Sequence, residues 1–294
     1  MNDILNANMD ITFETKCYEN DWEYLLKTRY LNKMIANCNV NFQFKQLIIN
    51  NVESPEEVKK YADKKVKEKV IDAYYFVDDY IDEALKYFDL TKDSLGNGYY
   101  YSTAEFVGLY LSKTKYHLHF ASDSYLVKKG NSKWIIEACD ILDKYSEYIV
   151  ANPTWNFDYQ QVINESIGEG VGNFYIGYGF SDQCYLVKTD TFREKIYNYK
   201  HPESERYPKH AGELFEKRVD SYMRTKNLYR ITSIKESYIH QNFPKSKNKK
   251  PVLLLINLNL YYSLCYLNIL KNKIRNYLKG IIKRYILCTA SNKI

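Results

Sequence analysis

Three consecutive segments each predict a β-strand followed by a helix, and this order constrains the fold more than any other feature of the chain. Residues 10–38 begin with a β-branched and aromatic run and continue into a helical spacing of apolar residues. Residues 42–69 repeat this order, with Pro55 at the expected helix start, where a missing N–H costs nothing. Residues 69–88 form a third such unit. Successive strand–helix units predict an α/β fold in which helices flank a mostly parallel sheet.

A fourth unit brings one acidic residue to the end of an apolar strand. Residues 99–114 predict a helix that Ser102 or Thr103 caps, and "YHLHFASDSYLV" then predicts a strand that stops near Asp123. Ligands bind beyond the carboxyl ends of strands in open parallel sheets. Asp123 is therefore a candidate ligand-binding residue. The alternative is a carboxylate that caps the strand or is simply solvated.

The pattern changes in the second half of the chain. Residues 131–153 predict an amphipathic helix and a short strand, residues 173–192 two strand-like segments, and residues 211–227 another helix. The lysine-rich stretch "PKSKNKKP" is the only convincing boundary. We therefore expect one α/β domain over residues 1–244 and a basic, hydrophobic, helical segment over residues 245–294.

Charge is divided unequally between these two parts. The chain has a net charge of +6, but residues 245–294 hold 11 basic residues and no acidic one. The 31 basic and 36 acidic residues that remain give residues 1–244 a net charge of −5. A duplex-binding domain would carry its basic face on the folded body. Nucleic acid is therefore not an expected partner.

The C-terminal segment has two interpretations. Residues 251–270 are 20 positions without a charge, which is long enough to span a bilayer, and residues 271–287 place apolar and basic residues at the spacing of a helix on an anionic membrane surface. The alternative is a pair of helices packed on the main domain. The N-terminus lacks a signal-peptide pattern, and the six scattered cysteines lack disulfide-framework spacing. These features predict a cytoplasmic protein, with a peripheral position on the cytoplasmic face of a membrane if the segment binds lipid.

Several local patterns between residues 10 and 243 together resemble the nucleotide-sugar glycosyltransferases of the Rossmann-like GT-A fold, particularly the family 2 type. "ITFETKCYENDWEYLL" is similar to their opening strand and nucleotide-binding loop, and "LIINNVESPEE" to the segment that holds the uracil or ribose. The resemblance implies a UDP-sugar donor. The nucleotide-binding residues that it implies are Thr15, Glu19, Asp21, Asn51, Glu53 and Ser122.

"STAEFVGLYLSKTKYHLHFASDSYL" is similar to the helix and strand that end in the DxD motif of this family. Ala121 stands in the place of the first aspartate, Ser122 in the middle, and Asp123 in the place of the second, which usually contacts a divalent ion. The resemblance implies an Mn²⁺ or Mg²⁺ cofactor held by Asp123, with His240 as a second ligand. Such an ion neutralises the charge that develops on a departing diphosphate. A lone histidine can equally be structural.

Three carboxylates are candidates for the catalytic base that takes the proton of the acceptor hydroxyl. "GFSDQCYLV" resembles a segment that follows the acceptor region in such enzymes, which nominates Asp182. Glu213 and Glu216 are three residues apart and are expected to share one helix face. The alternatives are that Asp182 fixes a turn and that the two glutamates cap or solvate a helix.

Two aromatic residues, Trp155 and Tyr159, can stack on an acceptor sugar or pack in the core. With these residues the sequence predicts a glycosyltransferase that moves a sugar from a UDP-sugar to a cell-surface glycan or lipid-linked acceptor, with inversion favoured by the family 2 resemblance. The alternative is a catalytically silent GT-A-like binding protein recruited to a membrane or partner. A nucleotidyltransferase would need a Gly-rich first loop with Arg and Lys, which the chain lacks.

Overall fold

The computed structural model describes residues 8–127, 133–240, 242–243, 266–275 and 277–279. The chain divides into two compact units, Met1–Phe243 and Pro244–Ile294. In the second unit the described residues, 266–275 and 277–279, are helical. No helix among the residues described in either unit is long and apolar enough to cross a membrane.

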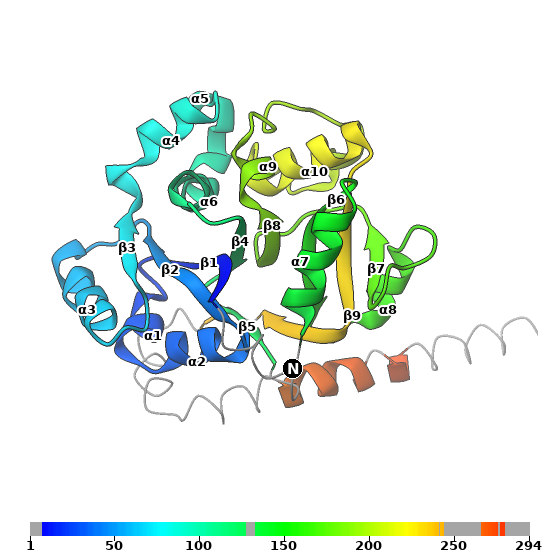
Figure 1. Cartoon of the computed structure of the whole chain (residues 1–294), viewed down its shortest axis with the longest axis horizontal. Coiled ribbons are helices and arrows are strands. Elements are labelled where there is room, and N and C mark those ends of the chain that lie inside the picture. The colour runs from blue at the N-terminus through cyan, green and yellow to red at the C-terminus, as the bar shows by residue number, and fades with distance from the viewer. Residues whose placement is uncertain (1–7, 128–132, 241, 244–265, 276, 280–294) are drawn as a thin grey trace, which may run out of the picture. The chain divides into compact units, whose positions relative to one another are not determined.

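The first unit is built on one nine-stranded sheet, whose N-terminal part is parallel (Figure 1). Strands β1 (Asn8–Cys17), β2 (Asn41–Ile49), β3 (Ala73–Phe76) and β4 (Tyr116–Phe120) lie in the order β3-β2-β1-β4, and neighbours in this order are parallel. These strands come from the strand–helix units that the sequence predicts, so the α/β class is confirmed.

The remaining strands make the sheet mixed. β8 (Cys184–Lys188) is antiparallel to both β4 and β6 (Tyr148–Trp155), and β9 (Tyr229–His240) is parallel to β6. Two shorter strands, β5 (Ser124–Leu126) and β7 (Phe174–Gly177), are both antiparallel to β9. Because β8 enters beside β4 in the opposite direction, the chain before β8 lies at the same sheet edge as the carboxyl end of β4.

Helices flank the sheet (Figure 1). The α-helices are α1 (Trp22–Lys27), α2 (Tyr30–Asn37), α3 (Pro55–Lys67), α4 (Ile81–Tyr87), α5 (Lys92–Leu95), α6 (Tyr99–Leu111), α7 (Trp134–Lys144), α8 (Tyr159–Asn164), α9 (Thr189–Arg193) and α10 (Phe215–Lys226). Short 3₁₀ helices span Val77–Asp79, Gly96–Gly98, Pro202–Arg206 and Lys209–Ala211. A large apolar core joins α4, α6, α9 and α10 to the sheet, with Phe88, Phe106 and Phe215 among its buried rings.

The expected capping of α6 is wrong, because the helix begins at Tyr99, so Ser102 and Thr103 lie within it. Ser102 Oγ instead accepts a hydrogen bond from the Phe215 N–H (2.8 Å), and Thr103 Oγ1 accepts one from the Asn50 side chain (3.1 Å). Ser102 therefore ties α6 to the start of α10, and Thr103 ties it to the loop after β2.

Alternation along β1 sends neighbouring side chains to opposite faces of the sheet. Phe13 packs against Phe42 and Phe120. Glu14 and Lys16 point to the other face, where they meet α6. Glu14 and Lys16 of β1 therefore both lie beneath this one helix.

Candidate functional site

Asp123 and His240 lie side by side, although 117 positions separate them in the sequence. Asp123 occupies the turn between β4 and β5, and β5 pairs with the end of β9 so that Ser124 is opposite His240. His240 Nε2 is 3.3 Å from an Asp123 carboxylate oxygen, and the side chains are 25% and 15% exposed. Burial lowers the pKa of His240, but the hydrogen bond and charge of Asp123 outweigh burial and raise that pKa above 6.5. A carboxylate and an imidazole are both ligands for a divalent ion.

Asp21 connects the loop after β1 to the same turn. The Ser122 hydroxyl donates a hydrogen bond to Asp21 Oδ2, and the Tyr18 N–H donates to Oδ1 at 2.7 Å. Asp21 is 2% exposed, and burial raises its pKa to about 7. Both carboxylate oxygens already have partners, so in this structure Asp21 and Ser122 hold the turn at Asp123 in place.

The loops after β1 and β2, which hold predicted nucleotide-binding residues, lie next to each other. The Glu19 N–H donates to the Asn51 carbonyl at 3.3 Å, and the Glu53 N–H donates to Glu19 Oε2 at 2.9 Å. Thr15 does not belong to this loop. It lies within β1 and is fully buried, so its assignment to the nucleotide-binding loop is wrong.

A cluster of charged side chains lies where β1 and the segment before β8 approach α6 and α10. Lys16 makes ion pairs with Glu105 and, at 2.9 Å, with Asp182. The Asp182 N–H donates to Glu216 Oε1 at 2.7 Å. Two of the three predicted base candidates, Asp182 and Glu216, are therefore brought together. Sequence reasoning missed Lys16 and Glu105, although the alternation along β1 signals that Lys16 faces α6.

The carboxyl groups of Asp182 and Glu216 have pKa values that are displaced in opposite directions from their usual values. Burial alone would raise the pKa of Asp182, but the Lys16 ammonium outweighs it and lowers the pKa to about 2. Burial, followed by the negative charge of Asp182, raises the pKa of Glu216 well above its usual value. Burial raises the pKa of Glu105 to about 7 against the charge of Lys16. Such divergence separates Asp182, a carboxylate that stays ionised, from Glu216, a carboxyl group that binds a proton more readily.

Glu213 does not belong to this cluster. The helix α10 begins only at Phe215, so Glu213 and Glu216 do not share a helix face, and that expectation is wrong. Glu213 instead accepts a hydrogen bond from Lys217 at 2.8 Å. The reason is Gly212, whose φ of +69° turns the chain immediately before Glu213. The helical spacing of "AGELFEKRVDSYM" extends past this turn in the sequence but not in the fold.

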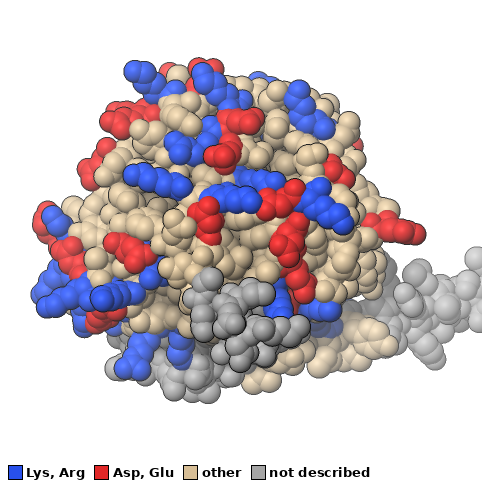
Figure 2. All heavy atoms as spheres, in the orientation of Figure 1, with Lys and Arg blue, Asp and Glu red and all other residues tan. Residues whose placement is uncertain are grey.

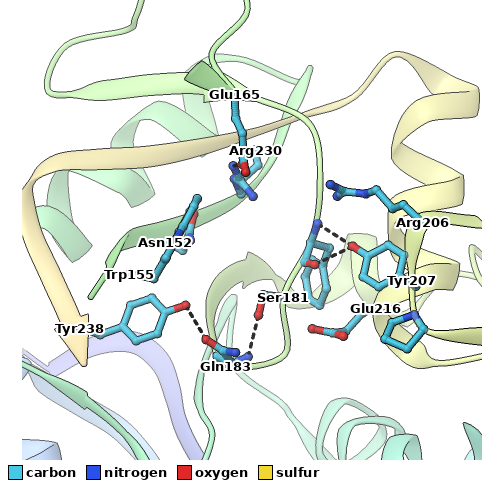
Figure 3. Close-up of a pocket in the computed structure, with 12 residues that line it drawn as sticks. Asn152, Trp155, Glu165, Ser181, Gln183, Arg206, Tyr207, Glu216, Arg230 and Tyr238 are labelled. Carbon is cyan, nitrogen blue, oxygen red and sulfur yellow. Dashed lines mark hydrogen bonds and ion pairs between the residues drawn. The ribbon is translucent and has the colours of Figure 1, made fainter. Parts of the chain in front are cut away.

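A cavity of about 500 Å³ opens between β6, β9 and the segments before β8 and α10. Figure 3 shows Trp155 and Arg230 on one side of it and Tyr207 and Glu216 on the other. The Arg230 guanidinium lies 5.3 Å from the centre of the Trp155 ring. Tyr159, in α8, is not among the lining residues. Of the two predicted aromatic platform residues, only Trp155 therefore lines this cavity.

A smaller cavity of about 240 Å³ lies on the other side of Glu216, with Asp182, Tyr101 and His210 in its lining. Glu216 lines both cavities. Glu216 therefore faces two spaces that can each hold part of a ligand, whereas Asp182 lines only the smaller one.

No protein-family model matches the chain, and no curated protein matches it. Similar solved structures include GalNAc-T7 with UDP, GalNAc and Mn²⁺, at 8% identity and a TM-score of 0.48 over 79% of this chain and 44% of that chain. Another is glucosyl-3-phosphoglycerate synthase from Mycobacterium tuberculosis with Mn²⁺, UDP and glucosyl-3-phosphoglycerate. It has 9% sequence identity and a TM-score of 0.42 over 82% of this chain and 75% of that chain. A third is UDP-glucose pyrophosphorylase complexed with UDP-glucose. It has 11% sequence identity and a TM-score of 0.40 over 81% of this chain and 91% of that chain. The nine-stranded sheet and its flanking helices agree with the α/β fold class predicted from the sequence.

Proposed function

We propose that the protein is a glycosyltransferase that moves a sugar from a UDP-sugar donor to an acceptor hydroxyl. The observation that carries the proposal is the convergence of two groups at one sheet edge. Asp123 and His240 form a pair of potential cation ligands, and Asp182 and Glu216 form a carboxylate pair with divergent pKa values. Proton abstraction and diphosphate departure need these two kinds of group close together.

The donor set at Asp123 and His240 suits an Mn²⁺ or Mg²⁺ ion whose remaining ligands are diphosphate oxygens and water. Bound there, the ion supplies positive charge that stabilises the departing diphosphate. The adjoining loops, with Glu19, Asn51 and Glu53, would contact the nucleoside.

The acceptor would occupy the larger cavity, with the face of a sugar ring against Trp155. Glu216, ionised, would take the acceptor hydroxyl proton as that oxygen bonds to the anomeric carbon, and the bond from this carbon to the diphosphate breaks with its electron pair on the diphosphate. The charge of Asp182 keeps Glu216 basic, and Lys16 holds Asp182 ionised. A base on the side opposite the diphosphate would invert the anomeric carbon.

The test uses the purified full chain with a panel of UDP-sugars, with and without Mn²⁺. We expect slow, Mn²⁺-dependent release of UDP by hydrolysis without acceptor, and faster release with a glycan or lipid-linked acceptor. An increase of the melting temperature with UDP and Mn²⁺ together would support donor binding. If UDP-sugars neither bind nor release UDP under any metal condition, the proposal is wrong.

The buried Ala121 in the place of the first DxD aspartate favours the second candidate, a silent GT-A-like binding protein. It predicts metal-dependent UDP binding with no UDP release from any donor. The panel above therefore separates the two functions.

For the C-terminal unit we propose attachment to an anionic membrane surface at its cytoplasmic face, close to a lipid-linked acceptor. The described helical residues expose Leu267, Leu270, Ile274 and Leu278, with lysines and an arginine between them. Residues 251–265 of the uncharged stretch lie outside the described residues. We expect the full chain to sediment with vesicles that contain phosphatidylserine and not with neutral vesicles. Sedimentation with neither kind, or equal sedimentation with both, would contradict the attachment.

Figure 2 shows acidic and basic side chains intermixed over one face of the main unit, without a continuous basic surface there.

A further inference from the structure

A second group of potential metal ligands lies inside the sheet. Glu14 on β1 and His119 on β4 are directly opposite each other in the parallel ladder, and His117 is two residues before His119, on the same face. All three side chains have zero exposure. One ligand atom from each lies within 4.8 Å of the other two. None of these residues takes part in the proposed transfer reaction.

The distances in this group suit a small metal ion. Glu14 Oε1 is 3.3 Å from His117 Nε2 and 3.0 Å from His119 Nδ1. A tetrahedral ion about 2.0–2.2 Å from its ligands separates two ligand atoms by about 3.3–3.6 Å. An ion therefore fits between the carboxylate and each imidazole after movements of about a few tenths of an ångström. Two histidines spaced by one residue on a strand offer two nitrogens to one ion.

The ring nitrogens here are short of hydrogen-bond partners. His117 Nδ1 and His119 Nε2 have no hydrogen-bond partner among the described residues, and His117 Nε2 has only the Glu14 carboxylate 3.3 Å away, without hydrogen-bond geometry. Burial of a polar atom without a partner is costly, and an unpaired buried group in a native fold calls for an unseen ligand or water. A cation on His117 Nε2 would use one of these lone pairs.

Surrounding contacts orient the carboxylate and the rings. The Gln46 side chain donates to Glu14 Oε2 and to the Gly108 carbonyl. A Cβ at Gly108 would overlap the Glu14 carboxylate, so α6 can approach only because this residue is glycine. The Tyr185 ring stacks on His119 with centroids 4.9 Å apart. Outer contacts of this kind fix ligand direction at metal sites.

We propose that Glu14, His117 and His119 form a buried site for a Zn²⁺ ion, separate from Asp123 and His240. Two imidazoles and one carboxylate are a ligand set that suits Zn²⁺, with water in the fourth position. The ion would join β1 to β4 directly below Lys16, which follows Glu14 on the same face of β1. Its charge would offset the excess of carboxylates over lysine in this layer.

The test is the metal content of the full chain produced in zinc-supplemented medium. After loosely bound ions are removed with a chelator, we expect about one zinc per chain by mass spectrometry. Production with cobalt in place of zinc should give the visible absorption of tetrahedral Co²⁺ with nitrogen ligands. The double variant His117→Gln, His119→Gln should lose both signals. The matched control His201→Gln and the double variant Asp123→Ala, His240→Ala should keep them.

The wild-type protein alone can overturn the proposal, so it does not depend on folding of the variants. Zinc below about one-tenth per chain, with no cobalt absorption and no rise of the melting temperature on adding Zn²⁺, would mean that the three side chains form a metal-free hydrogen-bonded cluster. Full metal content in the His117→Gln, His119→Gln variant would place the zinc elsewhere. Failure of sugar transfer has no bearing on either readout.

Discussion

Glu216→Gln is expected to lower kcat for sugar transfer by about 10²–10⁴-fold, the usual contribution of a general base, while the Kd of the donor changes little. An amide keeps the size of the side chain and its oxygen can still accept the hydrogen bond from the Asp182 N–H. The fold should therefore persist while the proton acceptor is lost. The measurement is steady-state kinetics of UDP release with acceptor, together with calorimetric donor binding.

Glu213→Gln is the matched control, since it removes a nearby glutamate that is paired with Lys217 and lines neither cavity. Its kcat should remain within about threefold of the wild type, as expected for a group outside the reaction. Full activity of Glu216→Gln combined with a large loss in Asp182→Asn would assign the base to Asp182 instead. Full activity of both variants would exclude a carboxylate base from this pair.

The pH dependence of the wild-type activity also tests the assignment of Glu216 as the base. The base must be ionised, and burial with the Asp182 charge raises the pKa of Glu216, so activity should fall as pH drops through that raised pKa. Asp182→Asn removes a negative charge beside Glu216, which lowers the pKa of Glu216 and moves the acidic limb of the profile to lower pH. A limb that does not move would mean that another group titrates.

The first half of the fold was predictable because its information is local. Each strand–helix unit carries its own periodicity, and Pro55 begins its helix as expected. Asp123 at the end of an apolar strand was found for the same reason. The helix boundary before Glu216 was misjudged because a helical spacing continues through Gly212 in the sequence. In the structure the helix begins only at Phe215, after Gly212 with its positive φ and Leu214 with its extended ψ.

The side chains that accompany the candidate site were not predictable, since their contacts join distant segments. Lys16 meets Glu105 and Asp182 across 89 and 166 positions of sequence, and only the insertion of β8 antiparallel to β4 brings Asp182 to this edge. The sequence predicts that the two histidines of "YHLHF" belong to an apolar strand. Their partner Glu14 lies in β1, and the sequence pattern does not show that β1 and β4 are neighbours in the sheet. Periodicity predicts which face a residue occupies, and strand order decides what it meets there.

Asp123→Ala is expected to abolish the tightening of UDP binding by Mn²⁺. Loss of a direct ligand should weaken ion binding by more than the roughly 10–100-fold that loss of an outer partner costs. His240→Ala should weaken it less if diphosphate oxygens and water replace the imidazole. The measurement is the Kd of UDP with Mn²⁺ and without it, and the exposed Asp190→Ala should behave as the wild type.

The same site should respond to pH in a direction that identifies His240. Only the neutral imidazole binds a metal, and Asp123 raises the pKa of His240 above 6.5, so Mn²⁺ affinity should rise with pH through that raised pKa. In Asp123→Asn the carboxylate that raises this pKa is gone, so the residual metal binding should set in at lower pH. Unchanged Mn²⁺ dependence in Asp123→Ala would show that the ion is held elsewhere, and the turn between β4 and β5 would then be a strand connection whose resemblance to DxD has no role in metal binding.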